Sequence, residues 1–274
     1  MNKYLYYSIL ILSILSFLVV SCSKDDEETP DTLAVDLGND KVIPEGETTT
    51  LDAGNPGSTY LWSTGATTQT ISVDTSGYYW VKVTSGDLYG DDTVRVDLSY
   101  KVARIDSDYG IILMWLYPQT PLHRDNFFKL TSEKYYDSVI FHRVIDNFVI
   151  QTGDPTGTGS GGPGYTIPAE FRSSLKHIHG AVGAARLSDN INPTKASSGS
   201  QFYIVDNVNG SPHLDGNYTV FGIVVDGIDA VNAISGVPTN SNDRPLTDVY
   251  MKTVTIVNYT AKELKDNFGF TVTK

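Results

Sequence analysis

The stretch FHRVIDNFVIQTGDP, residues 141–155, holds an arginine, an aromatic ring and a side-chain amide within a few positions of one another. Side chains an even number of positions apart lie on one face of a strand. Arg143 and Gln151 would therefore converge on one pocket if two short strands flank a turn at residues 146–147. A guanidinium that stays charged, beside the apolar floor that Phe148 offers, can bind an amide group without hydrolysing it. The stretch predicts a binding pocket for a peptide group.

This spacing resembles the signature of the cyclophilins, the peptidyl-prolyl cis-trans isomerases. Three further segments match that family in the same order: GTGSGG at 157–162, SGSQFYI at 198–204, and LDG at 214–216 followed by VFG at 220–222. The resemblance covers residues 100–259. It implies a mainly β fold, in which a closed eight-stranded antiparallel barrel is capped by two helices and carries the substrate groove on its outer face.

The resemblance also implies roles for individual positions. Arg143 would be the catalytic guanidinium, and Gln151 would hydrogen-bond the backbone of the substrate. The positions expected to bind substrate are Phe148, Val149, Gly159, Ala185, Arg186, Gln201, Tyr203, His213, Leu214 and Tyr218. No metal or other cofactor is expected.

Four of these positions depart from the eukaryotic family pattern. Tyr203 replaces a phenylalanine, Arg186 an asparagine, His213 a tryptophan and Tyr218 a histidine. Tyr218 can still cover a proline ring and offers a hydroxyl, so isomerase activity is expected to persist. Loss of the indole donor at position 213 argues against tight cyclosporin binding.

The expected mechanism follows from the amide bond. Its rotation meets a barrier of ~18–20 kcal/mol because the C–N bond has double-bond character. In the twisted transition state the proline nitrogen becomes pyramidal and gains a lone pair, so a donor placed there stabilises that state selectively. Arg143 is expected to be this donor.

Two helices are predicted in the same region. Thr120 followed by Pro121 is typical of a helix start, and the helix would run over residues 121–130. Ile228, Val231 and Ile234 recur at helical spacing, which predicts a short second helix over residues 228–234.

Residues 33–98 form a separate pattern, in which short strand-like runs alternate with turn signals. This pattern predicts a small β-sandwich and resembles the immunoglobulin-like modules of bacterial surface proteins. Trp62 and Tyr79 are interpreted as core residues rather than sugar-stacking ones. The unit carries no catalytic constellation, so it is interpreted as a spacer or binding module.

The N-terminus resembles a bacterial lipoprotein signal peptide over residues 1–21. Its apolar run, residues 9–20, is shorter than the ~20 residues that span a bilayer. The run ends at Cys22, the only cysteine in the chain, which would be lipidated. An ordinary secretory signal with an incidental cysteine is the alternative. Residues 22–32 are predicted to be an acidic tether, and residues 260–274 a C-terminal tail.

The formal net charge of −12 argues against a nucleic-acid partner, which would require a basic face. The expected partners are proline-containing polypeptides and a membrane bound through lipidated Cys22, and the chain is expected to be monomeric. The predicted location is the outer membrane of a bacterial envelope, on the periplasmic side or at the surface. The predicted function is prolyl isomerisation during the folding of exported proteins. The alternative is a lipid-anchored adhesion scaffold that binds proline-containing segments without catalysis.

Other chemistry in the chain has less support. Arg143 would be interpreted as a structural ion-pair partner if the surrounding motif were absent. His177 and His179 share a strand face, but no carboxylate or cysteine spacing completes a metal site. They are therefore interpreted as surface or barrel-rim residues. The glycine-rich loop lacks the Gly-Lys-Ser/Thr of a phosphate loop.

Overall fold

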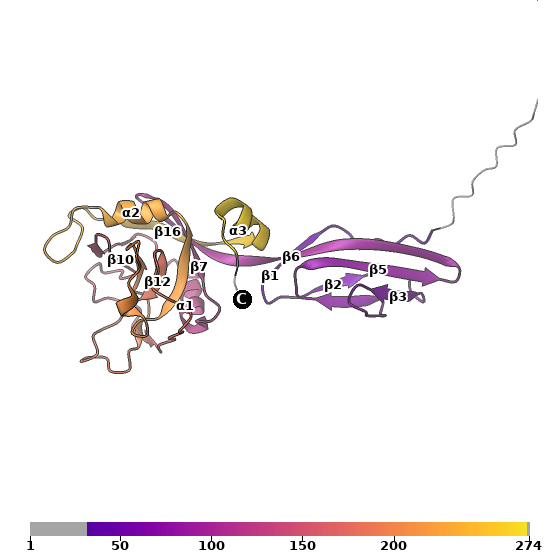
Figure 1. Cartoon of the computed structure of the whole chain (residues 1–274), viewed down its shortest axis with the longest axis horizontal. Helices are drawn as coiled ribbons and strands as arrows, with labels where there is room; N and C mark the ends of the chain where they lie inside the picture. Colours follow the sequence, from indigo (N-terminus) through magenta and orange to yellow (C-terminus); the bar gives the residue numbers. More distant parts are fainter. Residues whose placement is uncertain (1–31, 273–274) are drawn as a thin grey trace, which may run out of the picture.

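The computed structural model describes residues 32–272 and has an elongated shape, with a β-rich unit at each end (Figure 1). The smaller unit contains residues 33–98 and the larger one residues 100–259. Strand β6 (Leu88–Ser107) passes from one to the other, and helix α3 (Ala261–Phe268) lies beside the junction. The predicted signal peptide and Cys22 lie outside the described residues.

The smaller unit contains two sheets that enclose one core. Strands β2 and β4 form an antiparallel pair, while β3, β5, β6 and β1 form the second sheet. The bounds are β1 Lys41–Pro44, β2 Thr49–Asp52, β3 Thr59–Trp62, β4 Thr70–Val73 and β5 Gly77–Ser85. Side chains alternate between core and solvent along β5, which is the period of a half-buried strand. Trp62 and Tyr79 are buried, as predicted. The immunoglobulin-like topology stays a prediction.

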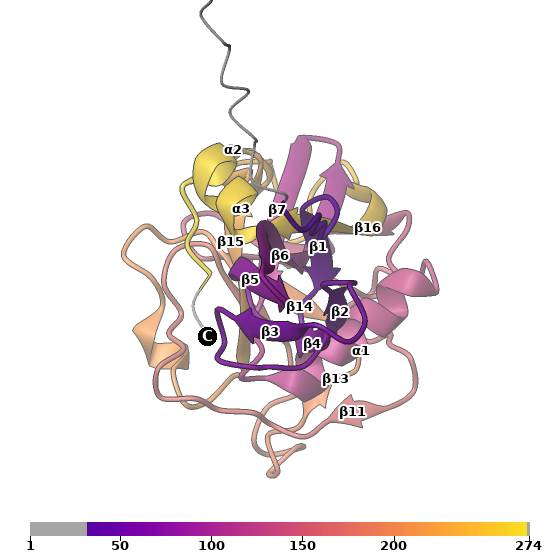
Figure 2. The same ribbon diagram turned by 90° about the vertical axis from the view of Figure 1, so that its right-hand side faces the viewer.

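The two units share a strand and a core, although the sequence analysis separated them near residues 98–100. The first half of β6 pairs with β5 and β1, and its second half pairs with β7 and β16. The predicted boundary therefore falls inside a continuous strand. Trp115 of β7 and Leu264 of α3 belong to the same apolar cluster as Trp62. Figure 2, turned from Figure 1 to face the smaller unit, shows its strands stacked in front of the larger one.

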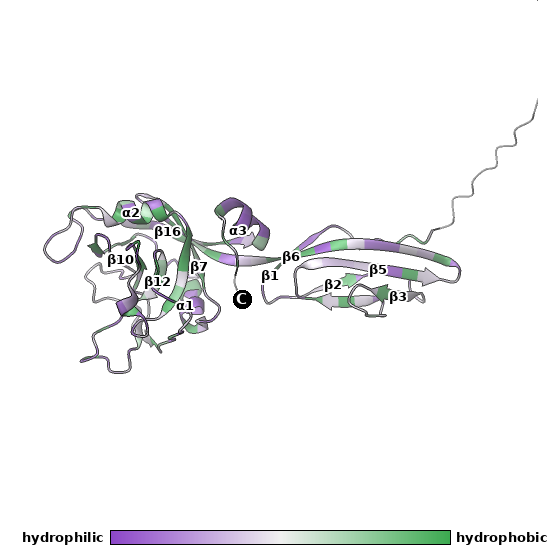
Figure 3. Cartoon of the chain, in the orientation of Figure 1, coloured by the Kyte–Doolittle hydropathy of each residue, from purple (hydrophilic) through white to green (hydrophobic). Residues whose placement is uncertain are grey.

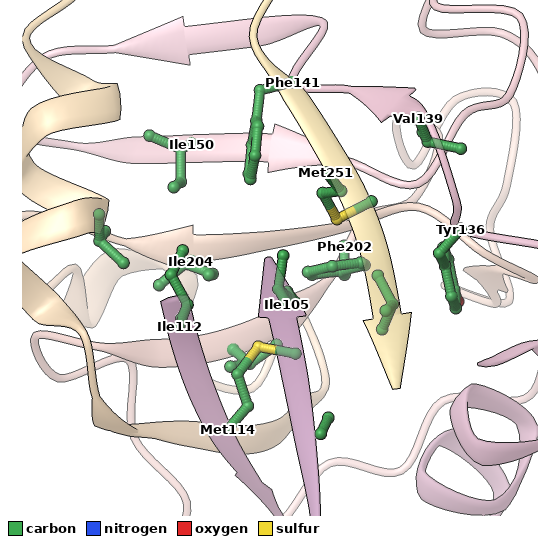
Figure 4. Close-up of a cluster of buried hydrophobic side chains, with 14 of the residues drawn as sticks. Ile105, Ile112, Met114, Tyr136, Val139, Phe141, Ile150, Phe202, Ile204 and Met251 are labelled. Atoms are coloured by element: carbon green, nitrogen blue, oxygen red, sulfur yellow. The ribbon is translucent and has the colours of Figure 1, made fainter. Parts of the chain in front are cut away.

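The larger unit is built from antiparallel strands in the order β6-β7-β15-β12-β14-β10-β9, with β16 pairing β6 and β8. The bounds are β7 Gly110–Leu116, β8 Val139–Ile140, β9 Arg143–Ile145, β10 Val149–Thr152, β12 Ala181–Ala184, β14 Phe202–Val205, β15 Val220–Asp226 and β16 Tyr250–Thr260. A separate short pair is formed by β11 (Thr166–Ile167) and β13 (Ser197–Ser198). The core of this unit includes Ile105, Met114, Phe202 and Ile204, which lie together in Figure 4.

The predicted closed eight-stranded barrel is wrong, because the strand pairing within residues 32–272 does not close. The ladder ends at β9 on one side and at β8 on the other, and no pairing joins these two strands. Only Phe141 and His142 separate them along the chain. The amide of Phe141 donates to the carbonyl of Val249, and that of Val144 to the carbonyl of Asp243. Irregular backbone therefore satisfies these amides in place of a neighbouring strand.

Both predicted helices are confirmed, as α1 (Pro121–Ser132) and α2 (Ile228–Ser235). Thr120 is the N-cap of α1 and Pro121 its first residue, but the Thr120 hydroxyl donates to the carbonyl of Tyr117 and accepts no helix amide. The buried carboxylate of Glu170 instead accepts the amides of Leu122 (3.2 Å) and His123 (3.0 Å). A negative charge at a helix N-terminus is stabilising, so Glu170 serves as the cap.

Helix α3 corrects the prediction of a plain C-terminal tail. Thr260 and Glu263 form a reciprocal capping box that starts this helix. The helix is largely hydrophilic (Figure 3), and Leu264 is its only buried residue. Phe270 follows it and packs against Trp115, with ring centroids 5.9 Å apart. The end of the chain is therefore part of the junction between the units.

We expect Leu264→Ala to lower the free energy of unfolding by about 2–5 kcal/mol, because it opens a cavity in the shared core. Lys262→Ala is the matched control, since the Lys262 side chain is 65% exposed, and its effect should stay within about 0.5 kcal/mol. Urea unfolding followed by tryptophan fluorescence measures both. Equal effects of the two substitutions would contradict a structural role for α3.

Candidate active site

One row of residues crosses four neighbouring strands of the larger unit. Arg143 of β9 lies opposite Gln151 of β10, Gln151 lies opposite Tyr203 of β14, and Tyr203 lies opposite Gly183 of β12. Directly opposite residues of antiparallel strands share a face, with Cβ atoms about 4.5–5.5 Å apart. The sequence prediction of two strands around a turn is confirmed, with Asn147 in the turn at φ 54°.

This row borders a cavity of about 220 Å³. Every residue lining it was proposed from the sequence: Arg143, Phe148, Val149, Gln151, Ala185, Arg186, Tyr203, Leu214 and Tyr218. The other three candidates lie next to it. His213 stacks on Phe148 with ring centroids 5.6 Å apart. Gln201 is hydrogen-bonded to Gln151, and the carbonyl of Gly159 accepts a hydrogen bond from Gln201.

Arg143 combines access to the cavity with an ion pair. Its side chain is 38% exposed, and its Nε lies 3.5 Å from Oδ2 of Asp243. Asp243 sits in the loop before β16 at φ 62°. An exposed pair of this kind adds little stability, typically below about 1 kcal/mol. It does restrict where the guanidinium points. Both interpretations of Arg143, ion-pair partner and cavity residue, are therefore met in the structure.

Gln151 is held by a chain of amides. Its Nε2 donates to Oε1 of Gln201 at 3.1 Å. Nε2 of Gln201 in turn donates to the carbonyls of Gly159 (3.1 Å) and Gly161 (2.8 Å). The glycine-rich loop therefore fixes the rotamer of Gln201, and Gln201 fixes that of Gln151.

Asp154 organises the glycine-rich loop from within. Its fully buried carboxylate accepts the amides of Thr156, Thr158, Gly159 and Gly161 at 2.7–3.0 Å. Burial by itself raises the pKa of this carboxyl, but the hydrogen bonds outweigh burial and hold the pKa far below its usual value. The loop is thus shaped around an anion of the protein and has no need of a bound phosphate.

Aromatic and cationic side chains also line the cavity. Tyr218 and Tyr203 meet edge to face with ring centroids 6.0 Å apart. The Arg186 guanidinium lies over the Tyr218 ring, 4.5 Å from its centroid, and its Nε donates to the carbonyl of Asn217 at 2.7 Å. Arg186 was expected to bind substrate, and the structure shows that its side chain also stabilises Tyr218.

Two residues that contact the site were not predicted from the sequence. Asp243 lies in a loop far from Arg143 in the chain, and no periodic pattern marks it. His177, interpreted as a surface or barrel-rim residue, is in fact buried and hydrogen-bonded to both Asp215 and Tyr203. Within residues 32–272 no cluster of three or more His, Cys, Asp or Glu side chains is arranged to hold a metal ion.

The larger unit is similar in sequence to proteins of one known family. The sequence model of the family "Cyclophilin type peptidyl-prolyl cis-trans isomerase/CLD" matches residues 102–256. The chicken (Gallus gallus) protein "Peptidyl-prolyl cis-trans isomerase-like 3" is 40% identical over 158 residues, which cover 56% of this chain and 93% of that protein. A "putative bifunctional phosphatase/peptidyl-prolyl cis-trans isomerase" of Streptococcus pyogenes is 36% identical over 183 residues, covering 56% of this chain and 38% of that protein.

A solved structure resembles the larger unit. It is a cyclophilin-type isomerase of Cryptosporidium parvum, crystallised in the presence of the dipeptide Ala-Pro, with a TM-score of 0.53 and 32% sequence identity. The similarity covers 57% of this chain and 98% of that one. Since the family match includes every residue that lines the cavity, the chain belongs to the cyclophilin family and is a peptidyl-prolyl cis-trans isomerase of that type.

Proposed function

We propose that Arg143 is the catalytic residue of this isomerase and that its substrates are X-Pro bonds in exported proteins of a bacterial cell envelope. The observation that carries the proposal is the row in which the Arg143 guanidinium and the Gln151 amide lie beside an aromatic cavity. The cavity would hold the proline ring against Phe148, Leu214 and Tyr203. Gln151 would then hydrogen-bond the backbone of the substrate.

Rotation is accelerated when the twisted amide is stabilised more than the planar one. The guanidinium would donate to the lone pair that the proline nitrogen gains on twisting. Bringing an exchange of tens to hundreds of seconds to milliseconds requires about 10⁴–10⁵-fold, or about 6–7 kcal/mol. One charge-assisted hydrogen bond supplies a fraction of this. Preorganisation supplies the rest, through the Asp243 contact to Arg143 and the amide chain behind Gln151.

Arg143→Ala should lower kcat/KM by about 10²–10³-fold, the usual cost of removing one transition-state donor. Arg143→Lys keeps the charge but loses the planar fork, and should lose less activity. A protease-coupled assay on an Xaa-Pro peptide measures both. Arg104→Ala is the control, because Arg104 pairs with Asp106 on β6 and lines no part of the cavity.

No acceleration by the unmutated protein, together with measurable peptide binding, would favour the non-catalytic scaffold. Full activity in Arg143→Ala would contradict the role of this arginine.

The buried Asp154 carboxylate gives a second prediction, with a defined pH dependence. Asp154→Asn should lower the free energy of unfolding at pH 7 by about 2–3 kcal/mol, because several amides lose an anionic acceptor. The folded-state pKa is depressed, so this stabilisation is present above the unfolded value of about 3.9 and is lost as the pH falls through the folded pKa.

Urea unfolding of both proteins between pH 7 and pH 3 tests this. Asp146→Asn, in the exposed turn before Phe148, is the control and should change little. A stability difference that grows toward acid pH would contradict the assignment.

The location of the protein in a bacterial cell envelope is proposed from the sequence, and the elongated shape of residues 32–272 supports it. The Leu33 amide donates to the carbonyl of Tyr89 at 3.1 Å, so the described chain starts at the end of β6 that is remote from the cavity. From Tyr89 to Tyr100 this strand spans roughly 35 Å. The sandwich would therefore space the active site away from an anchor at Cys22. Within residues 32–272 no helix is long and apolar enough to cross a membrane.

Lipidation of Cys22 and a monomeric working form belong to the same proposal. Radiolabelled palmitate should be incorporated into the full-length chain in bacteria, and Cys22→Ala should abolish incorporation. Palmitate label that persists in the Cys22→Ala variant would exclude this anchor. That result would not bear on isomerase activity, which the peptide assay tests separately.

A further inference from the structure

Tyr203 carries a hydroxyl where the eukaryotic family pattern has phenylalanine. The absence of a side chain at Gly183 leaves space for the ring and its hydroxyl. The Tyr203 ring lies over Gly183 on the neighbouring strand β12. A Cβ at position 183 would come within 2.3 Å of Tyr203 Cζ and within 2.5 Å of its Oη. A glycine is therefore required at this point for Tyr203 to keep its position.

The hydroxyl has one buried partner. Tyr203 Oη lies 2.9 Å from Nε2 of His177, and Nδ1 of His177 lies 2.8 Å from Oδ1 of Asp215. The same carboxylate oxygen accepts the His177 backbone amide at 3.0 Å. A carboxylate only accepts hydrogen bonds, so Nδ1 carries the proton and Nε2 is the acceptor. Tyr203 therefore donates to His177, and His177 donates to Asp215.

These partners are shielded from solvent. Tyr203 is 5% exposed, and the His177 side chain is fully buried. A buried hydroxyl that loses its acceptor is disfavoured by a factor of about 5–150. The Tyr203 ring borders the cavity, which is the solvent-accessible space next to it. Without the His177 acceptor, the ring would turn toward this opening to hydrate its hydroxyl and would occupy the space of a proline ring.

Asp215 links this chain of hydrogen bonds to another wall of the cavity. It directly follows Leu214 at the end of the 3₁₀ helix η1 (Pro212–Leu214), and Leu214 lines the cavity. The backbone amide of Ser211, just before η1, donates to the His177 carbonyl at 2.6 Å. His177 therefore contacts both the Tyr203 wall and the segment that carries Leu214.

We propose that His177 is a positioning residue that sets the shape of the proline pocket: with Asp215 it holds the Tyr203 hydroxyl behind the pocket, so that only the ring faces the substrate. This inference rests on the proposed use of the cavity as the proline site. It assigns His177 no contact with substrate. Its effect is on substrate affinity, and it acts only through the Tyr203 hydroxyl.

A double-mutant cycle separates this role from simple support of the core. The variants are His177→Leu, Tyr203→Phe and the combination, measured by kcat and KM on an Xaa-Pro peptide and by titration with the same peptide. His177→Leu alone should raise KM and the peptide Kd by about 5- to 100-fold, with kcat changed less than about 3-fold. In the Tyr203→Phe background the same substitution should change Kd less than about 3-fold, because no hydroxyl remains to be satisfied.

An equal rise of Kd in both backgrounds, or a loss confined to kcat, would overturn the proposal. His177→Gln offers an amide oxygen as acceptor and is the variant to use if leucine prevents folding. It should retain a Kd within about 5-fold of the unmutated protein, and a Kd as weak as that of a Tyr203→Ala variant would contradict the proposal. Because titration needs no turnover, an inactive protein that still binds the peptide would refute catalysis without refuting the His177 role.

Acid pH provides an independent readout. Protonated His177 carries hydrogen on both ring nitrogens and cannot accept from Tyr203. Burial lowers the pKa of His177 below its ordinary 6.5, and the hydrogen bond to Asp215 opposes this shift. The other charged or titratable groups facing the network are Lys176, His213, Arg186 and Tyr218. Kd should be constant above pH 6.5 and should rise as the pH falls through the lowered pKa. The same rise in Tyr203→Phe would contradict the mechanism.

Discussion

The pairing register of β14 between β10 and β12 is the constraint on which the site depends. It places Tyr203 opposite both Gln151 and Gly183, and Arg143 follows one strand further on. Side chains alternate between faces, so a slip of one residue would exchange Tyr203 for Phe202 or Ile204. Both of these are fully buried in the core of the larger unit, where the free energy of apolar burial fixes the register. Core packing on one face of the sheet therefore aligns the polar groups on the other.

Each polar side chain of the site is then oriented by a partner distant in the sequence. Asp243 contacts Arg143, Gln201 contacts Gln151, and His177 contacts Tyr203. Such contacts contribute little to global stability when exposed, but they restrict rotamers before substrate arrives. Asp154 does not contact Gln151 or Gln201 directly. Its buried carboxylate shapes the glycine-rich loop, and carbonyls of that loop hold Gln201. In the proposed mechanism the chemistry is confined to the Arg143 guanidinium, and most of the surrounding polar structure determines where that group and the cavity walls lie.

The residues that line the cavity could be predicted from the sequence, because they lie in or next to short family motifs. The alternation of Arg143 and Gln151 around a turn is a local signal, and the remaining lining residues followed from a family resemblance. Long-range polar contacts were missed, since nothing near Asp243 or His177 in the sequence specifies its partner. The continuity of β6 across the predicted unit boundary was not foreseen, because turn signals separate the flanking strands but do not exclude a long strand that both units share. Helix α3 was recognisable from the capping box of Thr260 and Glu263, although its Leu264 becomes buried only through tertiary packing.

We propose that strand register brings the Arg143 guanidinium and the proline pocket together around one X-Pro bond. A crystal structure of the protein with a bound Xaa-Pro peptide tests it most directly. We expect the proline ring in the cavity against Phe148 and Tyr203, and an Arg143 nitrogen within about 3 Å of the proline amide or its carbonyl. We also expect the Tyr203 hydroxyl to remain hydrogen-bonded to His177. A proline ring bound outside the cavity, or an Arg143 that contacts only Asp243, would contradict it.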